Sequence, residues 1–294
     1  MKYYIEENIH TIQCSPQEFS LVLVNEKKKN VDKQTYTNAN FFGNYSEQGE
    51  AFTLPAGHLV ADYESDSKWE RHYCEERGKF IGDKFYFDAG KWIGDSQFYG
   101  KNLTSLIIEN NKARIEEIKN IQDSYQYVVS GVPVIRNGKD VKYYGDVTGQ
   151  GYNTSVLYAT KHIFVGLKKN NSNIYIMGYK TTSANLIYSA EMFKKLSALG
   201  YYDVIKLDGG GSYYFEVNGS VKDTMSENRR ISGIICVKDI EEETPTEDKD
   251  TVSDWAKISW DKAVEKKIVS STDPQANVTR EMFVFILNKI GFLD

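Results

Sequence analysis

Short hydrophobic runs separated by polar turns make up most of the chain up to residue 238. Such runs, with partial alternation and bounded by Ser-Pro, Asn-Gly or glycine-rich turns, are typical of β-strands. Residues 27–33 are basic and polar, and we interpret them as a solvated loop. Strands are predicted over residues 9–14, 19–24, 84–88, 126–137, 156–167, 174–179, 204–207, 213–217 and 231–237. The strand over 126–137 is interrupted by Gly131 and Pro133.

Two segments have helical periodicity. In residues 189–200 the hydrophobic side chains fall on one face, Ser189 can cap the first turn and Gly200 can end the helix. In residues 110–122 isoleucines recur near helical spacing, which predicts a surface helix. The predicted fold is α+β, with a mixed, mainly antiparallel β-sheet core and flanking helices.

The composition changes after residue 238. Residues 239–251 (DIEEETPTEDKDT) are acidic and contain one proline, which is typical of an extended linker. Residues 252–294 contain two helix-like segments and predict a small helical hairpin. We therefore expect a main domain over 1–238, a linker over 239–251 and a helical module over 252–294. A unit this small has little stability of its own, so we expect it to dock or self-associate.

Composition and charge narrow the classes of function. The chain has 294 residues and a net charge of −5, so it lacks the basic footprint of a nucleic-acid-binding protein. Its three cysteines are far apart and form neither a disulfide framework nor a zinc pattern. The first residues lack the apolar core of a signal peptide, and no run could span a bilayer. We expect synthesis in the cytoplasm and no membrane partner.

The stretch DVIKLDGGGSYYFEVNG, residues 203–219, carries the main candidate chemistry. A short hydrophobic strand ends in Asp208, and Gly209, Gly210, Gly211 and Ser212 follow. Glycines let a ligand approach the main chain, and successive free N–H groups can form an anion-binding nest. An ordinary glycine-rich connection between two strands remains the alternative.

A second polar cluster occurs early in the chain, in TNANFFGNY at residues 37–45. The amides of Asn38 and Asn40 can donate to and accept from sugar hydroxyls or phosphate oxygens. The alternative is a turn whose phenylalanines belong to the core. His58 and His72 have no partner at metal-ligand spacing, and the acidic residues near Asp208 lack a calcium-loop pattern. No cofactor is therefore required, and a divalent cation is left open.

Five motifs together resemble a known family. NANFFG, SGVPVIRNG, a helix ending in ALG, KLDGGGS and RRISGIICV occur in the order found in the phosphodiester glycosidases, the family of N-acetylglucosamine-1-phosphodiester α-N-acetylglucosaminidase. The resemblance covers about residues 5–238. The family pattern leads us to expect a strand that contains Arg-Thr. This chain has YATKHIFVGL there, so Lys161 stands in for the arginine. Lysine lacks the bidentate fork of arginine.

The resemblance implies hydrolysis of a sugar-1-phosphodiester at the anomeric C–O bond. Asp208 would then act as a base, stabilise positive charge or hold a cation, with Arg230 and Lys161 as the other catalytic residues. Substrate binding would fall to the two asparagines and the glycine turn. The substrate-binding set is Asn38, Asn40, Gly209, Gly210, Gly211, Ser212 and Arg229.

The C-terminal module resembles a single S-layer-homology repeat, and a hairpin that packs or dimerises is the alternative. The repeat favours a phage or clostridial protein that acts on a cell-wall or surface phosphopolysaccharide, reached from the virion or after lysis. Two other functions stay open. One is a non-catalytic carbohydrate-binding or virion structural protein on the same fold, and the other is an intracellular phosphodiesterase.

Overall fold

The computed structural model describes residues 1–91, 97–141, 149–152, 161–179, 189–226 and 228–238, together with Lys262 and Glu265. The chain divides into two compact units, Met1–Asp239 and Ile240–Asp294, and the architecture below is that of the first. The linker predicted over 239–251 and the helical module predicted over 252–294 lie outside the described residues, apart from Lys262 and Glu265. Both stay predictions.

Among the described residues, seven strands form a first sheet in which every neighbouring pair is antiparallel. In spatial order these strands are β1 (Lys2–Glu6), β2 (Ile9–Cys14), β16 (Ile174–Tyr179), β15 (Ile163–Lys168), β17 (Tyr201–Lys206), β13 (Val132–Arg136) and β14 (Lys139–Asp140).

The second sheet is mixed, because β3 and β7 pair in parallel while its other pairs are antiparallel. Its main path runs through β11 (Lys112–Ile118), β10 (Leu103–Glu109), β12 (Tyr127–Ser130), β7 (Leu59–Tyr63), β3 (Phe19–Lys27), β20 (Arg230–Val237), β4 (Tyr36–Asn38), β18 (Tyr214–Val217) and β19 (Ser220–Thr224). Strand β9 (Lys84–Phe87) pairs with β7 and with β8 (Lys79–Ile81), and β5 (Phe42–Glu47) pairs with β6 (Glu50–Pro55).

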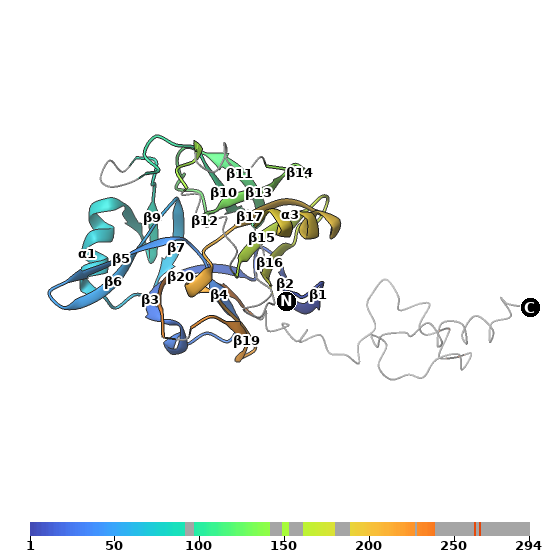
Figure 1. Ribbon diagram of the computed structural model, residues 1–294, viewed down its shortest axis with the longest axis horizontal. Helices are drawn as coiled ribbons and strands as arrows, with labels where there is room; N and C mark the ends of the chain where they lie inside the picture. The colour runs from blue at the N-terminus through green and yellow to red at the C-terminus, as the bar shows by residue number, and fades with distance from the viewer. Residues whose placement is uncertain are drawn as a thin grey trace, which may run out of the picture. The chain divides into compact units, whose positions relative to one another are not determined.

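The largest core cluster combines hydrophobic side chains of both sheets. Strand β15 shows how the sequence builds it: Ile163 and Val165 belong to this cluster, whereas Phe164 belongs to another cluster with Met192 and Leu196 of helix α3 (Ser189–Ala198). Successive side chains of a strand point to opposite faces. The first sheet is therefore buried on both faces, with α3 on one of them (Figure 1).

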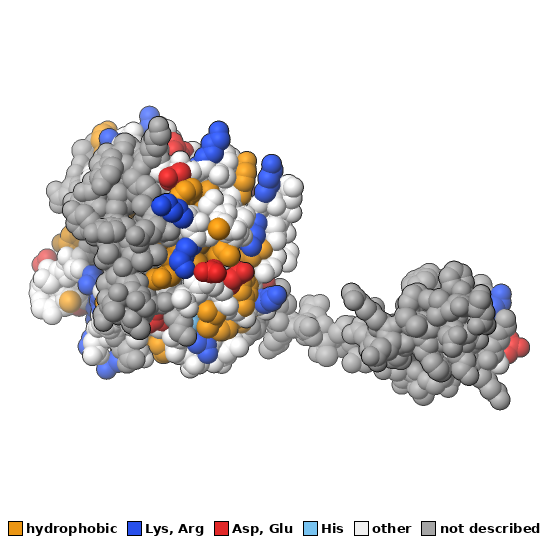
Figure 2. All heavy atoms as spheres, turned by 45° about the vertical axis from the view of Figure 1, so that its right-hand side comes forward, with side chains coloured by type: hydrophobic (Ala, Val, Ile, Leu, Met, Phe, Trp, Pro, Cys, Tyr) orange, Lys and Arg blue, Asp and Glu red, His pale blue; other side chains and the backbone are white. Residues whose placement is uncertain are grey.

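A second helix, α1 (Lys68–Arg77), lies beside the β5–β6 hairpin (Figure 1). Its N-terminus is capped by Ser67, whose hydroxyl accepts the N–H of Glu70. Neither described helix is long and apolar enough to cross a membrane. On the face shown in Figure 2, lysine and arginine side chains of the described part are interspersed with acidic, hydrophobic and neutral ones.

The predicted α+β class with a mainly antiparallel β core and the helix near the end of the domain are confirmed, and one local prediction is wrong. Residues 110–122 form no helix: Asn110 and Asn111 have φ of 50° and 56° and turn the chain between β10 and β11. The isoleucine spacing is misleading because β10 supplies a strand partner for residues 112–118. The interruption predicted within residues 126–137 is found at Gly131, and the two strands on either side of it, β12 and β13, lie in different sheets.

The basic stretch 27–33, predicted as a solvated loop, is mostly exposed or half-buried. Lys28 is the exception: it begins a short 3-10 helix, η1 (Lys28–Asn30), and is fully buried. The predicted strand 156–167 lies outside the described residues up to residue 160, and its described part overlaps β15.

Candidate active site

The glycine turn follows β17 and contains the short 3-10 helix η4 (Gly210–Ser212). Gly210 has φ of 56°, a left-handed conformation that favours glycine. At Gly209 a Cβ atom would lie 2.4 Å from the main-chain oxygen of Lys161, so a side chain would not fit there. The glycines thus allow the turn to pack directly against the segment that precedes β15.

The early asparagine motif holds this turn in place. The Asp208 N–H donates to the carbonyl of Ala39 at 3.1 Å, and Asn38 Nδ2 donates to the carbonyl of Asp208 at 2.8 Å. Asn38 Oδ1 accepts the N–H of Tyr214 at 3.0 Å. Asn38 is 1% exposed. Its amide therefore fixes the main chain on both sides of the turn, and the structure does not present it to a sugar.

Asn40 has a related structural position. Its Nδ2 donates to the carbonyl of Phe41 at 2.9 Å. A Cβ atom at Gly233 would lie only 2.2 Å from Asn40 Oδ1, so the amide packs directly against this glycine. The side chain is 2% exposed, so Asn40 also packs within the protein instead of lining an open site.

Two lysines hold the turn from other sides. Lys28 Nζ donates to the carbonyls of Gly211 and Tyr213 at 3.0 and 3.2 Å. The main-chain oxygen of Lys161 accepts the N–H of Gly210 at 2.9 Å, while its ammonium forms an ion pair with Asp223. The Lys161 ammonium, which was predicted to neutralise a phosphate, is therefore already paired with the Asp223 carboxylate.

The predicted anion nest is not formed as such. The Gly209 N–H donates to the Asp208 carboxylate at 2.9 Å, and the Gly210 N–H is taken by Lys161. Two of the three glycine N–H groups thus donate hydrogen bonds within the protein. An anion at this turn would depend on side-chain charge more than on main-chain donors.

The two neighbouring arginines have different surroundings. Arg229 lies against the turn, with Nη1 2.9 Å from the position that a Cβ at Gly211 would take, and its guanidinium lies 5.8 Å from the ring centre of Phe42. Burial raises the pKa of the Asp208 carboxyl, and the charge of Arg229 acts weakly in the opposite direction. Of the two arginines, Arg229 is the one that contacts the glycine turn.

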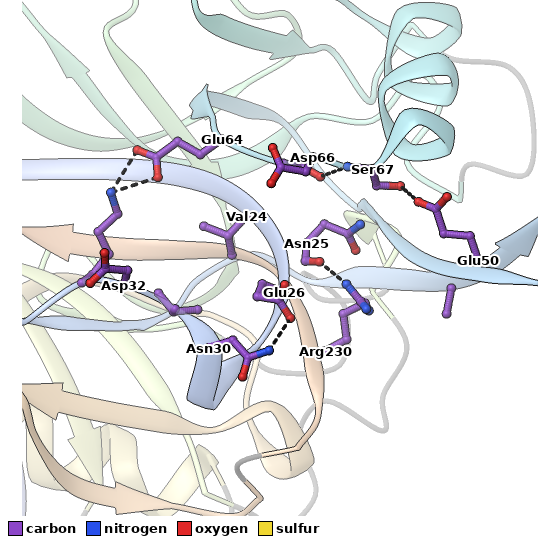
Figure 3. A pocket seen from close by; sticks show the side chains of 14 residues that line it. Val24, Asn25, Glu26, Asn30, Asp32, Glu50, Glu64, Asp66, Ser67 and Arg230 are labelled. Carbon is purple, nitrogen blue, oxygen red and sulfur yellow. Dashed lines mark hydrogen bonds and ion pairs between the residues drawn. The ribbon is translucent and has the colours of Figure 1, made fainter.

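Arg230 lines a different pocket, of about 530 Å³, and donates to the main-chain oxygen of Asn25 (Figure 3). Acidic side chains dominate this pocket, among them Asp32 and Asp66, and Lys33 pairs with Glu64 there. The prediction that Arg230 acts together with Asp208 receives no support from this placement.

Asp208 is half-buried at the head of the turn. Burial raises the pKa of its carboxyl above the ordinary value. Ser212, Lys206, the Gly209 N–H and Arg229 act in the opposite direction because they favour the ionised form. The buried Ser212 side chain lies beside the carboxyl, and its predicted part in substrate binding stays a prediction.

Lys206 is a residue of the site that the sequence-based set omits. Its side chain is 2% exposed, Nζ donates to the carbonyl of Leu207 at 3.2 Å, and the ammonium lies 5.3 Å from the ring centre of Phe41. Burial lowers the pKa of Lys206 to about 8, opposed by the charge of Asp208. A spacing of two from Asp208 on a strand places both side chains on one face, so the sequence contains a signal for it.

No group of three or more carboxylate, histidine or cysteine side chains within the described ranges is arranged to hold a metal ion. The divalent cation left open by the sequence stays a prediction. The two histidines have structural neighbours: His58 is fully buried with Nδ1 3.3 Å from Asp88, and the exposed His72 lies 3.4 Å from Glu76.

The site as described thus combines a half-buried carboxylate with one arginine and one buried lysine. Asp208 can accept a proton from water or stabilise positive charge, and Arg229 can hold an anion beside it. Among the other predicted residues, Asn38 and Lys161 position the turn through the contacts given above. Asn40 packs against Gly233, and Arg230 lines a different pocket.

Comparisons with known proteins agree with this architecture. The family model of the phosphodiester glycosidases matches residues 34–238. Among solved structures, the chain is similar to the catalytic domain of zebrafish N-acetylglucosamine-1-phosphodiester α-N-acetylglucosaminidase auto-inhibited by its pro-peptide. The TM-score is 0.53 at 13% sequence identity, over 81% of this chain and 81% of that chain. A hypothetical protein from Synechocystis matches with a TM-score of 0.41 at 11% identity, over 81% of this chain and 61% of that one.

No protein of curated function matches the sequence. The likeness to the zebrafish domain shows a common fold, and the family match covers well over half of the chain. This chain therefore belongs to the phosphodiester glycosidase family.

Proposed function

We propose that the protein hydrolyses a sugar-1-phosphodiester at the bond between the anomeric carbon and the phosphate oxygen. The observation that carries the proposal is that Asp208 begins the glycine turn and Arg229 packs against Gly211 of the same turn. The guanidinium has a planar set of donors that matches phosphate oxygens. The main chain of Asp208 is held by Asn38 and Ala39.

In this reaction Arg229 binds the phosphate, and Asp208 accepts a proton from the attacking water. The water oxygen bonds to the anomeric carbon as the C–O bond to phosphate breaks, and the phosphomonoester leaves with the electron pair. A phosphate leaves more readily than a plain alkoxide, so a second carboxylate acting as general acid is not needed. Burial raises the pKa of the Asp208 carboxyl above its ordinary value, and this makes Asp208 a stronger base.

The substitution Asp208→Asn tests the proposal directly. It keeps the size of the side chain and removes the base, so we expect sugar release from a sugar-1-phosphodiester to fall by a factor of about 10² to 10⁴, typical of general-base catalysis. Circular dichroism and urea unfolding would verify that the variant folds. Turnover equal to that of the wild type in a folded variant would remove Asp208 from the chemistry.

The same assay separates catalysis from binding. The structure gives one reason to consider a binding protein on this fold, because Lys161 is paired with Asp223 and Asn38 is occupied by the main chain. A binding protein would retain the diester in equilibrium dialysis without releasing sugar. Wild-type protein that binds but never hydrolyses a panel of sugar-1-phosphodiesters would favour that function.

For the biological substrate we propose a cell-wall or surface phosphopolysaccharide. This part rests on the resemblance of residues 252–294 to an S-layer-homology repeat, in a region beyond the described residues. Incubation of the full chain with purified bacterial walls should release reducing sugar or phosphomonoester. Release confined to small soluble diesters would instead favour an intracellular phosphodiesterase.

A further inference from the structure

The first strand of the chain, β1, lies at the edge of a sheet. Within the described part of the chain β1 pairs with β2 alone, and it stands first in the strand order of its sheet (Figure 1). Its five residues, KYYIE, pair with β2 in an unbroken register, and Ile5 is 48% exposed. An edge strand without proline, glycine or bulge presents main-chain groups to which another strand can bind.

The turn after β1 shows which of these main-chain groups are free. Glu7 and Asn8 have φ of 51° and 62°, which is typical of a two-residue type I′ hairpin turn. Such a turn is closed by a hydrogen-bonded pair, here Glu6 and Ile9. Hydrogen-bonded and non-hydrogen-bonded pairs alternate along an antiparallel ladder. Every second residue of β1, counted back from the residue next to Glu6, therefore directs its N–H and C=O away from β2.

Tyr3 and Ile5 are these residues, and their spacing suits a second copy of the same strand. If two β1 strands pair in antiparallel fashion about a twofold axis at Tyr4, Tyr3 lies opposite the partner's Ile5 and Ile5 lies opposite the partner's Tyr3. Each of these pairs exchanges two N–H···O=C bonds, which gives about four main-chain hydrogen bonds across the axis.

The side chains of β1 are complementary to themselves in the same arrangement. Lys2, Tyr4 and Glu6 share one face of the strand. About the twofold axis Lys2 lies opposite the partner's Glu6, and Tyr4 lies opposite the partner's Tyr4. Opposite charges and aromatic rings that face each other stabilise antiparallel strands. Neither Lys2 nor Glu6 forms an ion pair with another described residue, so both charges are available to a partner.

The other edges of the two large sheets are less suited to such pairing. Strand β14, at the far edge of the first sheet, has two residues. In β19 the same twofold arrangement would place Lys222 opposite the partner's Lys222. In β11 the guanidinium of Arg114 is already paired with Glu109 and Glu116. Among the described edges, these contrasts favour β1.

A shallow hollow of about 450 Å³ adjoins β1 on the face that carries Tyr4. Its lining includes Lys2, Tyr4 and Glu6 together with Gln13 and Tyr175 of the neighbouring strands β2 and β16. The hollow leaves space in which side chains of a second β1 strand can pack on this face.

We propose that two copies of the chain associate through β1, so that the first sheet continues across a twofold axis. The inference concerns assembly and is independent of the proposed function. Pairing of one short strand buries a small area, and weak association is typical of small interfaces. We therefore expect monomer and dimer to be in equilibrium at micromolar concentrations.

Charge reversal tests the pairing in the full chain without an added tag. Sedimentation equilibrium between about 5 and 500 µM should show a dimer fraction that rises with concentration. Lys2→Glu places like charges opposite each other twice in the dimer, so we expect its dissociation constant to rise about tenfold or more. Combining Lys2→Glu with Glu6→Lys should restore dimerisation. Lys139→Glu, at an exposed position of β14, is the matched control and should have no effect.

A disulfide tests the register. The Cα atoms of a non-hydrogen-bonded pair lie about 4.5 Å apart, which is within the range that a disulfide spans. Tyr4→Cys should therefore form a disulfide-linked dimer under mild oxidation. Lys2→Cys should not, because its two copies lie about 14 Å apart in this register. The native cysteines Cys14, Cys74 and Cys236 are buried, so they do not compete.

Four outcomes would overturn the proposal. They are a monomer at every concentration, a dimer that Lys2→Glu leaves unchanged, a loss that the double reversal does not restore, and equal cross-linking of Lys2→Cys and Tyr4→Cys. The second of these would assign dimerisation to another part of the chain, such as the module predicted over 252–294. Circular dichroism verifies folding, and the activity assay is read separately, so failure of the dimer and failure of the proposed function are distinct.

Discussion

Replacing Lys206 by methionine separates the role of this lysine in the site from its effect on stability. The side chain is 2% exposed, and burial lowers its pKa from 10.5 to about 8. This difference corresponds to about 3 kcal/mol by which folding disfavours the charged lysine at neutral pH. Methionine has a similar length and no charge, and it loses the hydrogen bond to Leu207, which is worth about 1 kcal/mol. We therefore expect Lys206→Met to be about 2 kcal/mol more stable at pH 7.

The pH dependence has a definite direction. Between pH 8 and 10.5 the unfolded wild type keeps a proton on Lys206 that the folded protein has released, so the wild-type stability rises with pH in this window. The variant lacks this group. Its advantage should therefore shrink by about 2 kcal/mol between pH 7 and pH 9.5. Urea unfolding followed by tryptophan fluorescence at the two pH values measures this change.

Lys194→Met is the matched control, because Lys194 is exposed on α3 and its replacement should shift stability little at either pH. The reasoning would be refuted if Lys206→Met were less stable than the wild type at pH 7, or if the gap were the same at pH 9.5. Activity supplies a second measurement. In Lys206→Met, Asp208 loses the nearby ammonium that lowers its pKa, so the acid limb of the pH–rate profile should move to higher pH.

Three other predictions concern the turn. Gly211→Ala should raise KM with little change in stability, because the new Cβ would meet the flexible end of Arg229 at 2.9 Å. Gly209→Ala should lower the unfolding free energy by about 1–3 kcal/mol, because its Cβ would lie 2.4 Å from the main-chain oxygen of Lys161. Asn38→Ala should cost about 3 kcal/mol, since a buried carbonyl and a buried N–H lose their partner. Urea unfolding with steady-state kinetics measures all three, and a Gly211 variant less stable than the Gly209 variant would contradict the first two.

The turn itself could be predicted from the sequence because its signals are local. Asp208 after a hydrophobic run and three successive glycines occupy adjacent positions. Its partners could not be assigned in the same way. Asn38 lies 170 residues away along the chain, and the sequence does not reveal whether its amide faces a ligand or the main chain. Only the pairing of β4 with β18 and β20 shows that it faces the main chain.

The arginine pair shows why the set of site residues was only partly predictable. Neighbouring residues at a strand end point in different directions, so two adjacent arginines cannot both be expected to reach one carboxylate. The sequence gives no reason to prefer Arg229 to Arg230. Tertiary pairing decides: the Arg229 side chain contacts Gly211, while Arg230 bonds to Asn25 at the strand β3.

The charge at the turn also bears on the kind of phosphate that fits. Near Asp208, the ammonium of Lys161 is paired with Asp223, and that of Lys28 donates to two carbonyls of the turn. Within the described part of the chain, Arg229 has no carboxylate at ion-pair distance, while Lys206 supplies a second positive charge near Asp208. A phosphodiester carries a single negative charge, whereas a phosphomonoester carries roughly −1.5 to −2 at pH 7. With Lys206 balancing Asp208, Arg229 is left to balance one negative charge, which matches the proposed diester substrate better than its monoester product.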